Sequence, residues 1–346
     1  MKILADSTLP NLTTLFPPPF SISRYSTKQE LQKLLPMHNI LLCRANLPIN
    51  AELLQNQKLQ YIATASSGTD HIDTDYVASQ GITILDAKGC NSQAVTDYVV
   101  SVLATLHQQN YAIGKRAGVI GIGTIGTKIF TRLRTLGFDV IGYDPLQANN
   151  KYANGNICEL LTCDLICIHA AYHQTEPYPS ANLINIEFLN QLQANTIIIN
   201  AARGGIVVEQ DLLATKVPLI YCTDVYHNEP NINADIVQFA TICTPHIAGH
   251  SLEAKAAILI SLSTKLHNLC NLPIPTLAKP RTQPLLALQT KATATWQDVV
   301  LSLYNPLIET MQLKQAIDKQ RAFLMLRQAH KQRHDFNCYE SYNKSS

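Results

Sequence analysis

Three residues of the 346-residue chain carry side chains suited to proton transfer and carboxylate binding, and each follows an apolar run. Arg203 lies in Asn-Ala-Ala-Arg-Gly-Gly, Glu229 in Asp-Val-Tyr-His-Asn-Glu-Pro and His246 in Thr-Pro-His-Ile-Ala-Gly-His. A histidine, with an ordinary pKa of about 6.5, can take a hydroxyl proton, and a neighbouring carboxylate would raise that pKa and fix the ring. A guanidinium holds a carboxylate through two parallel hydrogen bonds. Together these residue types indicate oxidation of a 2-hydroxy acid.

Each of the three residues alone also has an ordinary structural explanation. Arg203 could form a surface ion pair, Glu229 could be a loop carboxylate before Pro230, and His246 could cap a helix or lie in the core. Their common position just after predicted strands favours the functional interpretation, because the carboxyl ends of parallel strands meet at one edge of a sheet.

The motif Gly121-x-Gly123-x-x-Gly126 lies between an apolar run and a helical pattern that begins near Ile125. The first glycine permits a tight turn, the second lets a pyrophosphate approach the backbone, and the third lets the helix pack closely. Asp144 follows the next apolar run, where a carboxylate would bind the adenosine ribose diol and repel a 2'-phosphate. The pattern therefore predicts NAD in preference to NADP.

Short apolar runs alternate with helical stretches along most of the chain, which favours parallel sheets covered by helices. We expect a doubly wound Rossmann sheet, a smaller discontinuous α/β substrate domain and a small C-terminal domain. The predicted boundaries are 1–91 with 252–272 for the substrate domain, 92–251 for the NAD-binding domain and 281–346 for the C-terminal domain. The tail is too small for a confident core of its own, so packing on a partner subunit is favoured.

Composition limits the possible partners and the compartment. With 46% hydrophobic and 15% charged residues and a formal charge of +2, the chain has no basic block that would indicate nucleic acid or an anionic membrane. No run is long enough to cross a membrane. Nine irregularly spaced cysteines match no zinc pattern and fit a reducing cytoplasm, and no metal is expected. Cys167, Cys222 and Cys243 lie in apolar runs and are expected to be buried.

Taken together, these motifs resemble the D-2-hydroxyacid dehydrogenase family over about residues 1 to 270. The resemblance implies a flavodoxin-like substrate domain beside the Rossmann domain, with Arg203 and Glu229 catalytic and His246 as proton donor and acceptor. The cofactor contacts that it implies, together with those of the glycine motif, are Gly121, Gly123, Ile125, Gly126, Asp144, Ala170, Asp224 and Gly249.

Within the family, the stretches Ser67–Asp73 and Gly89–Val99 look most like a branch that serves vitamin B6 synthesis and oxidises a phosphorylated four-carbon 2-hydroxy acid. The tail resembles the dimerisation domain of that branch, which implies a homodimer. The substrate contacts implied are Arg44, Ala45, Ser66, Gly68 and His250. Ala45, His250 and Ala170 replace the usual Ser, Tyr and Thr of the branch, whereas Ser66 keeps the hydroxyl of a usual Thr.

Two other functions stay open at this point. One is a dehydrogenase or 2-oxoacid reductase acting on glyoxylate, hydroxypyruvate or 3-phosphoglycerate, which the changes at Ala45 and His250 favour. The other is a dinucleotide-sensing binding protein similar to the corepressors of this family. Such a protein has no need of His246, so the intact set of Arg, Glu and His favours an enzyme.

Overall fold

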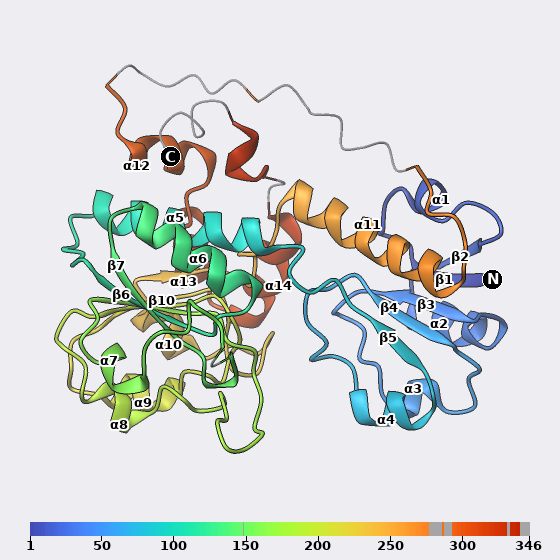
Figure 1. Cartoon of the computed structure of the whole chain (residues 1–346), viewed down its shortest axis with the longest axis horizontal. Helices are drawn as coiled ribbons and strands as arrows, with labels where there is room; N and C mark the ends of the chain where they lie inside the picture. Colours follow the sequence, from blue (N-terminus) through green and yellow to red (C-terminus); the bar gives the residue numbers. More distant parts are fainter. Residues whose placement is uncertain (148, 277–285, 287–292, 331–332, 340–346) are drawn as a thin grey trace. The chain divides into compact units, whose positions relative to one another are not determined.

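The computed structural model describes the whole chain except residues 148, 277–285, 287–292, 331–332 and 340–346 (Figure 1). The chain divides into two compact units, Met1–Asn91 with Glu253–Pro284 and Ser92–Leu252 with Leu285–Ser346. Each unit is an α/β structure with its own parallel sheet, in line with the expected fold class. The tail was expected to form a third domain over 281–346. By its contacts within the chain it belongs to the second unit instead.

The first unit is built on a five-stranded sheet in which all neighbouring strands are parallel. Its strands, in their order across the sheet, are β2 (Ser21–Tyr25), β1 (Lys2–Asp6), β3 (Ile40–Cys43), β4 (Tyr61–Thr64) and β5 (Thr83–Leu85). The order 2-1-3-4-5 is the flavodoxin-like one and reverses its winding between β1 and β3. The sequence has apolar runs at 3–5, 40–43, 61–63 and 82–85 for the other four strands. It has none for β2, because Ser-Ile-Ser-Arg-Tyr at the sheet edge contains no continuous apolar run.

Helices cover both faces of the first sheet, as a parallel sheet requires. They are α1 (Leu12–Leu15), α2 (Lys28–Leu34) with the 3-10 turn η1 (Leu35–Met37), α3 (Ala51–Leu54), α4 (Thr74–Ser79) and α11 (Leu252–Leu269). Leu12 of α1 and Leu262 of α11 belong to the core on one face. Leu31 of α2 and Val77 of α4 belong to the core on the other. Figure 1 shows α11 on one side of these strands and α3 and α4 on the opposite side.

The second unit contains a six-stranded sheet, again wholly parallel. Its strands, in their order across the sheet, are β11 (Ile242–Cys243), β10 (Ile220–Thr223), β9 (Ile197–Asn200), β8 (Leu165–Ile168), β6 (Arg116–Ile120) and β7 (Asp139–Tyr143). All six strands coincide to within two residues with apolar runs of the sequence, at 118–122, 140–143, 165–168, 196–199, 219–222 and 241–243. The winding reverses between β6 and β8, and ligands of such sheets bind at the carboxyl ends of the strands that flank this switch point.

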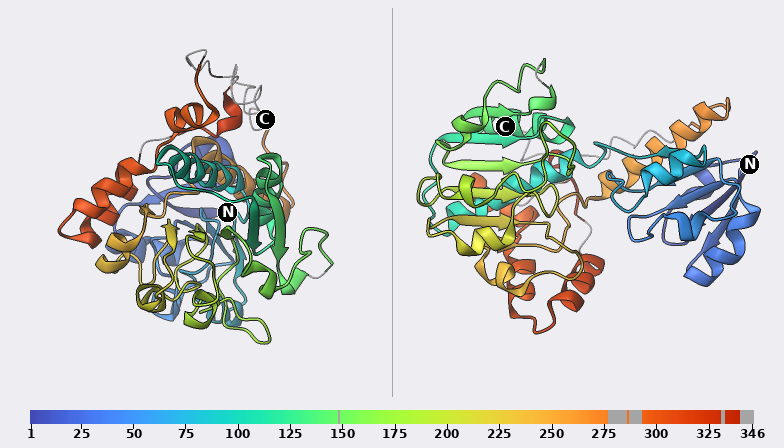
Figure 2. Two further views of the ribbon diagram at one scale, coloured as in Figure 1. Left: turned by 90° about the vertical axis from the view of Figure 1, so that its left-hand side faces the viewer. Right: turned by 90° about the horizontal axis from the view of Figure 1, so that it is seen from below.

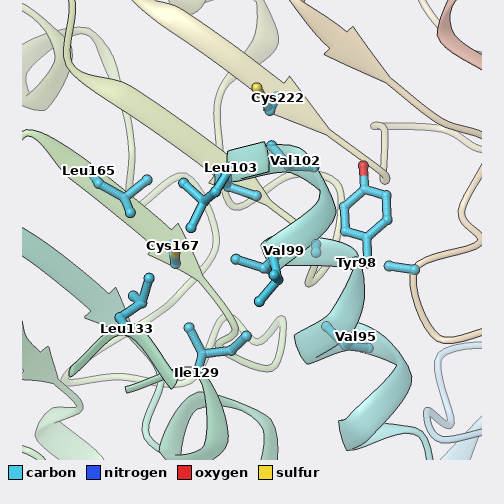
Figure 3. Packing of buried hydrophobic residues seen from close by; sticks show 14 of the residues in the cluster. Val95, Tyr98, Val99, Val102, Leu103, Ile129, Leu133, Leu165, Cys167 and Cys222 are labelled. Atoms are coloured by element: carbon cyan, nitrogen blue, oxygen red, sulfur yellow. The ribbon is translucent and has the colours of Figure 1, made fainter. Parts of the chain in front are cut away.

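Two layers of helix enclose the second sheet. Their members are α5 (Ser92–Gln108), α6 (Thr124–Thr135), η2 (Pro145–Gln147), α7 (Ile157–Leu160), α8 (Ile186–Leu189), α9 (Glu209–Ala214) and α10 (Ala234–Phe239). Figure 3 shows Val99 and Leu103 of α5 and Ile129 of α6 gathered around Cys167 of β8. Cys167, Cys222 and Cys243 are fully buried, which confirms that they act as small apolar residues.

The tail folds against the second unit of its own chain (Figure 2). It contains α12 (Trp296–Leu303), α13 (Leu307–Gln315), α14 (Lys319–Ala329) and the 3-10 turn η3 (Phe336–Cys338). Val300 joins the core beneath α5, and Leu313 and Phe323 join the core on the opposite face of the sheet. The chain itself therefore covers these faces of the tail, and packing on a partner subunit stays a prediction for its other faces. A helical apolar pattern does not reveal which surface will cover it.

Within the described ranges, the structure contains no helix that is both long and apolar enough to pass through a membrane.

Candidate active site

The glycine-rich turn joins β6 to α6 at the switch point of the second sheet. Gly121 has a φ of +87°, and a side chain there would collide with the backbone of Ala170, which follows β8. A side chain on Gly126 would meet the carbonyl oxygen of Gly121. Around Gly123, by contrast, no atom lies within 4 Å of the position that a Cβ would take. The turn is closed towards the protein and open at Gly123, so a pyrophosphate can reach its backbone.

Asp144 stands at the end of β7 beside this turn. Its Oδ2 accepts a hydrogen bond of 2.8 Å from the backbone N–H of Ile122, and its Oδ1 accepts one of 3.2 Å from Leu146. Each oxygen keeps a lone pair for a ribose hydroxyl. Ile125 packs on the core from the first turn of α6. The glycine turn and the carboxylate therefore fit a dinucleotide.

His169 is a residue of this edge to which the sequence assigned no role. It directly follows β8, and both ring nitrogens are buried without a hydrogen-bond partner among the described residues. Burial lowers the pKa of His169 to about 3, so its ring is neutral at pH 7. Buried polar atoms are normally paired, which makes this imidazole an unused donor and acceptor at the switch point. The position of His169 at the end of an apolar run predicts from the sequence that it lies at this edge, whereas the burial of its ring nitrogens is seen only in the structure.

The structure brings His246 and Glu229 into direct contact. Nδ1 of His246 lies 2.7 Å from Oε2 of Glu229, and the other carboxylate oxygen accepts a 2.9 Å hydrogen bond from the N–H of Tyr226. Burial alone would raise the pKa of Glu229, but the charge and hydrogen bond of His246 and the hydrogen bond from Tyr226 hold it below its usual value. Glu229 thus remains a carboxylate that occupies Nδ1, and Nε2 is left for proton exchange.

Asp224, at the end of β10, holds the loop that carries His246. Its carboxylate accepts hydrogen bonds from the N–H groups of Ile247 and Ala248, both 2.8 Å long, and one of 2.7 Å from the Thr244 hydroxyl. The backbone N–H of His246 donates to the carbonyl of Asp224 over 2.8 Å, and His246 has a φ of +56°. Asp224 was expected only as a cofactor contact. In the structure it also holds the backbone of the loop that carries His246.

Arg203 lies in the turn that follows β9. The turn is held by Asn200, whose side-chain amide donates to the carbonyl of Arg203 over 3.1 Å, and by Nη1 of Arg203, which donates to the carbonyl of Ala202 over 2.8 Å. Gly204, the next residue, packs so closely on the backbone of Tyr226 that a side chain would collide with it. Because Tyr226 also donates to Glu229, the turn with Arg203 and the loop with Glu229 are in contact.

The tail supplies two further side chains to this edge that the sequence did not indicate. Nη1 of Arg327, on α14, lies 3.9 Å from Oε2 of Glu229. His330 lies with its ring centre 6.1 Å from that of His250, and its Nδ1 is 3.0 Å from Oε1 of Glu309. Gly249 and His250 are both partly exposed in the same loop as His246.

Four of the expected substrate contacts, Arg44, Ala45, Ser66 and Gly68, lie at the carboxyl edge of the first unit's sheet. Arg44 follows β3, and its Nη1 donates a 3.1 Å hydrogen bond to the hydroxyl of Thr8, which follows β1. Arg44 thus stands at the switch point of this sheet. Ala45, beside it, is exposed and offers no polar group.

Ser66 and Gly68 follow the neighbouring strand β4. The hydroxyl of Ser66 accepts a 3.3 Å hydrogen bond from the N–H of Gly68, and the buried hydroxyl of Ser67 has no partner among the described residues. Burial and the charge of Arg44 lower the pKa of Lys255, on α11, so two cations influence each other at this edge. Lys255 was absent from the sequence prediction because it lies in an ordinary amphipathic helix.

The chain is also similar in sequence to known proteins. Residues 100–248 match the family model described as "D-isomer specific 2-hydroxyacid dehydrogenase, NAD binding domain". An erythronate-4-phosphate dehydrogenase of Legionella pneumophila is 48% identical over 98% of this chain and 96% of its own length. One from Saccharophagus degradans is 29% identical over 98% of this chain and 94% of its own length.

Solved structures of low sequence identity share the fold. The NAD complex of a formate dehydrogenase from Staphylococcus aureus covers 78% of this chain and 96% of its own, with a TM-score of 0.65 and 23% identity. A D-lactate dehydrogenase from Aquifex aeolicus with NAD and lactic acid covers 78% and 95%, with a TM-score of 0.65 and 21% identity. Residues 100–248 of the second unit, with the open glycine turn, form an NAD-binding domain. On its matched domain and its near full-length relatives, the chain belongs to the D-isomer specific 2-hydroxyacid dehydrogenase family.

Proposed function

We propose that this protein oxidises the C2 hydroxyl of 4-phospho-D-erythronate to the ketone, giving 2-oxo-3-hydroxy-4-phosphobutanoate, with NAD as cofactor. The observation that carries the proposal is the 2.7 Å contact between His246 and Glu229 at the carboxyl edge of the NAD-binding sheet. The name of the Legionella relative, 48% identical over 98% of the chain, supports the choice of substrate.

The proton and the carboxylate of the substrate are handled by two different side chains in this proposal. His246 takes the C2 hydroxyl proton on Nε2, because its Nδ1 is occupied by Glu229. Arg203 holds the substrate carboxylate and polarises the developing carbonyl. NAD, when bound beside the glycine turn, supplies the acceptor for the hydride that leaves C2.

The phosphate end of the substrate would be held by the first unit. Arg44 and Lys255 supply positive charge, and the hydroxyls of Ser66 and Ser67 supply donors. These contacts are the basis for preferring a phosphorylated acid over glyoxylate or hydroxypyruvate.

A second copy of the chain is the proposed partner. Although the tail buries one face on its own chain, it leaves large apolar side chains exposed on α13 and α14, namely Ile308 (59%), Met311 (56%), Leu324 (51%) and Met325 (56%). Large apolar side chains exposed on two helices in contact are typical of a surface that binds another protein. We expect Met311→Asp to convert a dimer into a monomer in sedimentation, whereas Leu213→Asp, an exposed apolar residue on α9, should not. A dimer that survives Met311→Asp would place the interface elsewhere.

The proposed compartment is the cytoplasm. All nine cysteines are free, and several lie buried in the sheet where oxidation would disrupt packing. Recovery of the protein with the periplasmic or membrane fraction of fractionated cells would contradict this placement.

The experiment that tests the function is the initial rate of NADH formation at 340 nm. Erythronate 4-phosphate should be compared with unphosphorylated erythronate and 3-phosphoglycerate, and a 2-oxoacid acceptor should be added if the purified protein retains its cofactor. We expect a clear preference for erythronate 4-phosphate. Turnover of another 2-hydroxy acid alone would overturn the substrate, and NAD binding without turnover of any acid would favour a binding protein.

A further inference from the structure

Helix α14 of the tail is anchored on the loop that carries Glu229. Phe323 is fully buried, and its ring meets that of Tyr226 edge to face, with centres 5.9 Å apart. The backbone N–H of Tyr226 donates to Oε1 of Glu229 over 2.9 Å. The contact between the two rings therefore sets the position of α14 relative to the carboxylate.

Arg327 follows Phe323 by four residues and so lies on the same face of α14. Its Nη1 is 3.9 Å from Oε2 of Glu229, the oxygen that also binds Nδ1 of His246. This distance is too long for a hydrogen bond and short enough for a charge interaction. With 33% of its side chain exposed, Arg327 can act without being fixed in one geometry.

The guanidinium of Arg327 provides a permanent positive charge beside the Glu229 carboxylate. To take a proton from the substrate, His246 must be neutral, and the mostly buried Glu229 would then lose the positive charge of its hydrogen-bonded partner. A guanidinium stays charged at any working pH, so Arg327 balances Glu229 in both protonation states of His246.

The other charged groups around the pair do not replace Arg327. Asp224 interacts with His246 from the end of β10, and Glu209 of α9 interacts with Glu229 and with His227. Asp224 and Glu209 are both acids, and they add negative charge beside Glu229. Their presence increases the need for a cation that does not titrate.

We propose that Arg327 is a positioning residue, which holds the Glu229 carboxylate charged and in place and so allows His246 to stay neutral before it accepts the substrate proton. This inference rests on the proposed function, since it assumes that His246 takes the proton. The C-terminal segment would then influence proton transfer as well as pack against the NAD-binding sheet.

The test measures kcat/KM against pH for Arg327→Gln and Arg327→Lys with erythronate 4-phosphate. Loss of the cation should favour protonated His246, so the pH of half-maximal oxidation should rise by about 0.5 to 1 unit. At pH values well below that midpoint we expect roughly a three- to tenfold loss of kcat/KM, which disappears at high pH, with KM nearly unchanged. Lys should restore most of the rate, because the contact depends on charge and not on a two-pronged geometry.

Arg321→Gln is the matched control, because Arg321 is an exposed arginine on the same helix. It should leave the pH profile unaltered. If Arg327→Gln fails to fold, Arg327→Met, which keeps the apolar stem, takes its place against Arg327→Lys. A rate loss that is equal at all pH values would indicate a structural role and overturn the inference, as would a rise in KM alone, which would indicate a substrate contact.

Combination with Glu229→Gln separates this inference from the proposed function. Once Glu229 is neutral, Arg327→Gln should have little further effect, because the two side chains act through one contact. If Glu229→Gln itself leaves turnover unchanged, the proposed role of the pair fails. If Glu229→Gln impairs turnover and Arg327→Gln behaves like Arg321→Gln, only the role of Arg327 fails.

Discussion

The buried carboxylate of Asp97, on α5, accepts a 2.9 Å hydrogen bond from the backbone N–H of Phe336 in the tail. Arg333 lies close by and donates to the carbonyls of Ala94 and Ala248 over 2.9 and 2.8 Å. These bonds tie the last described segment to the helix that opens the NAD-binding unit and to the loop that carries His246.

Asp97 should make stability depend on pH. Burial, and to a lesser extent Asp335, raise its pKa from 3.8 to about 7, against the opposing effects of Phe336 and Arg333. Because the folded protein binds this proton more tightly than the unfolded chain, the contribution is present below about pH 4 and is lost as the pH rises through about 7. We expect Asp97→Asn to reduce the loss of unfolding free energy between pH 5 and pH 8 by about 1–4 kcal/mol in urea titrations. Asp235→Asn, which neutralises an exposed acid, should leave this pH dependence unchanged. The prediction would be contradicted if unfolding free energy changed equally with pH in the wild type and both variants.

Replacement by alanine should impair stability at Gly121 and NAD binding at Gly123. Gly121→Ala forces a side chain into the backbone of Ala170 at positive φ and should cost about 2–4 kcal/mol of stability. Gly123→Ala has open space and a φ of −78°, so the protein should unfold at nearly the wild-type temperature. Its NAD affinity should fall by roughly tenfold or more, since the methyl group stands where the pyrophosphate approaches. Thermal unfolding and calorimetric NAD titration measure the two effects, and unchanged affinity in Gly123→Ala would be the contrary result.

His246→Gln should lower kcat for erythronate 4-phosphate by about 10²–10⁴, because the amide cannot accept the hydroxyl proton. NAD binding should be unaffected, since the glycine turn lies on other strands. Stopped-flow rates combined with NAD titration test both statements. A variant that keeps more than about a tenth of the wild-type rate would exclude His246 as the base.

Arg203→Lys should not restore function, in contrast to Arg327→Lys. A single ammonium cannot reproduce two parallel hydrogen bonds to a carboxylate, so kcat/KM should fall roughly a hundredfold. Steady-state kinetics of both lysine variants in one buffer makes the comparison direct. Near-normal turnover in Arg203→Lys would mean that Arg203 supplies only charge.

Arg44→Gln should affect only a phosphorylated substrate. Loss of a charged contact to the phosphate should raise KM for erythronate 4-phosphate by about ten- to a hundredfold. Any turnover of unphosphorylated erythronate should stay the same, and serves as the internal control. Equal losses with both substrates would place Arg44 outside the phosphate site.

Local sequence patterns determined the glycine turn, most of the strands and the order of the candidate site residues along the chain. The glycine turn, Asp144 and the six strands of the NAD-binding sheet follow from glycine conformation and apolar runs, which act over a few residues. The positions of Arg203, Glu229 and His246 after three of those strands were predictable for the same reason, because parallel strands deliver their carboxyl ends to one edge.

Tertiary structure alone decided the rest. Strand β2 is polar and is defined by its pairing with β1, and His169 becomes unusual only because its ring nitrogens are buried without partners. In the sequence, Arg327 is one more cation on an amphipathic helix, and Asp97 is a polar residue within an apolar one. Burial of Phe323 on Tyr226 brings Arg327 to Glu229, and packing of the tail brings Phe336 to Asp97. Contacts between segments so distant in sequence depend on how whole helices pack, which no local spacing specifies.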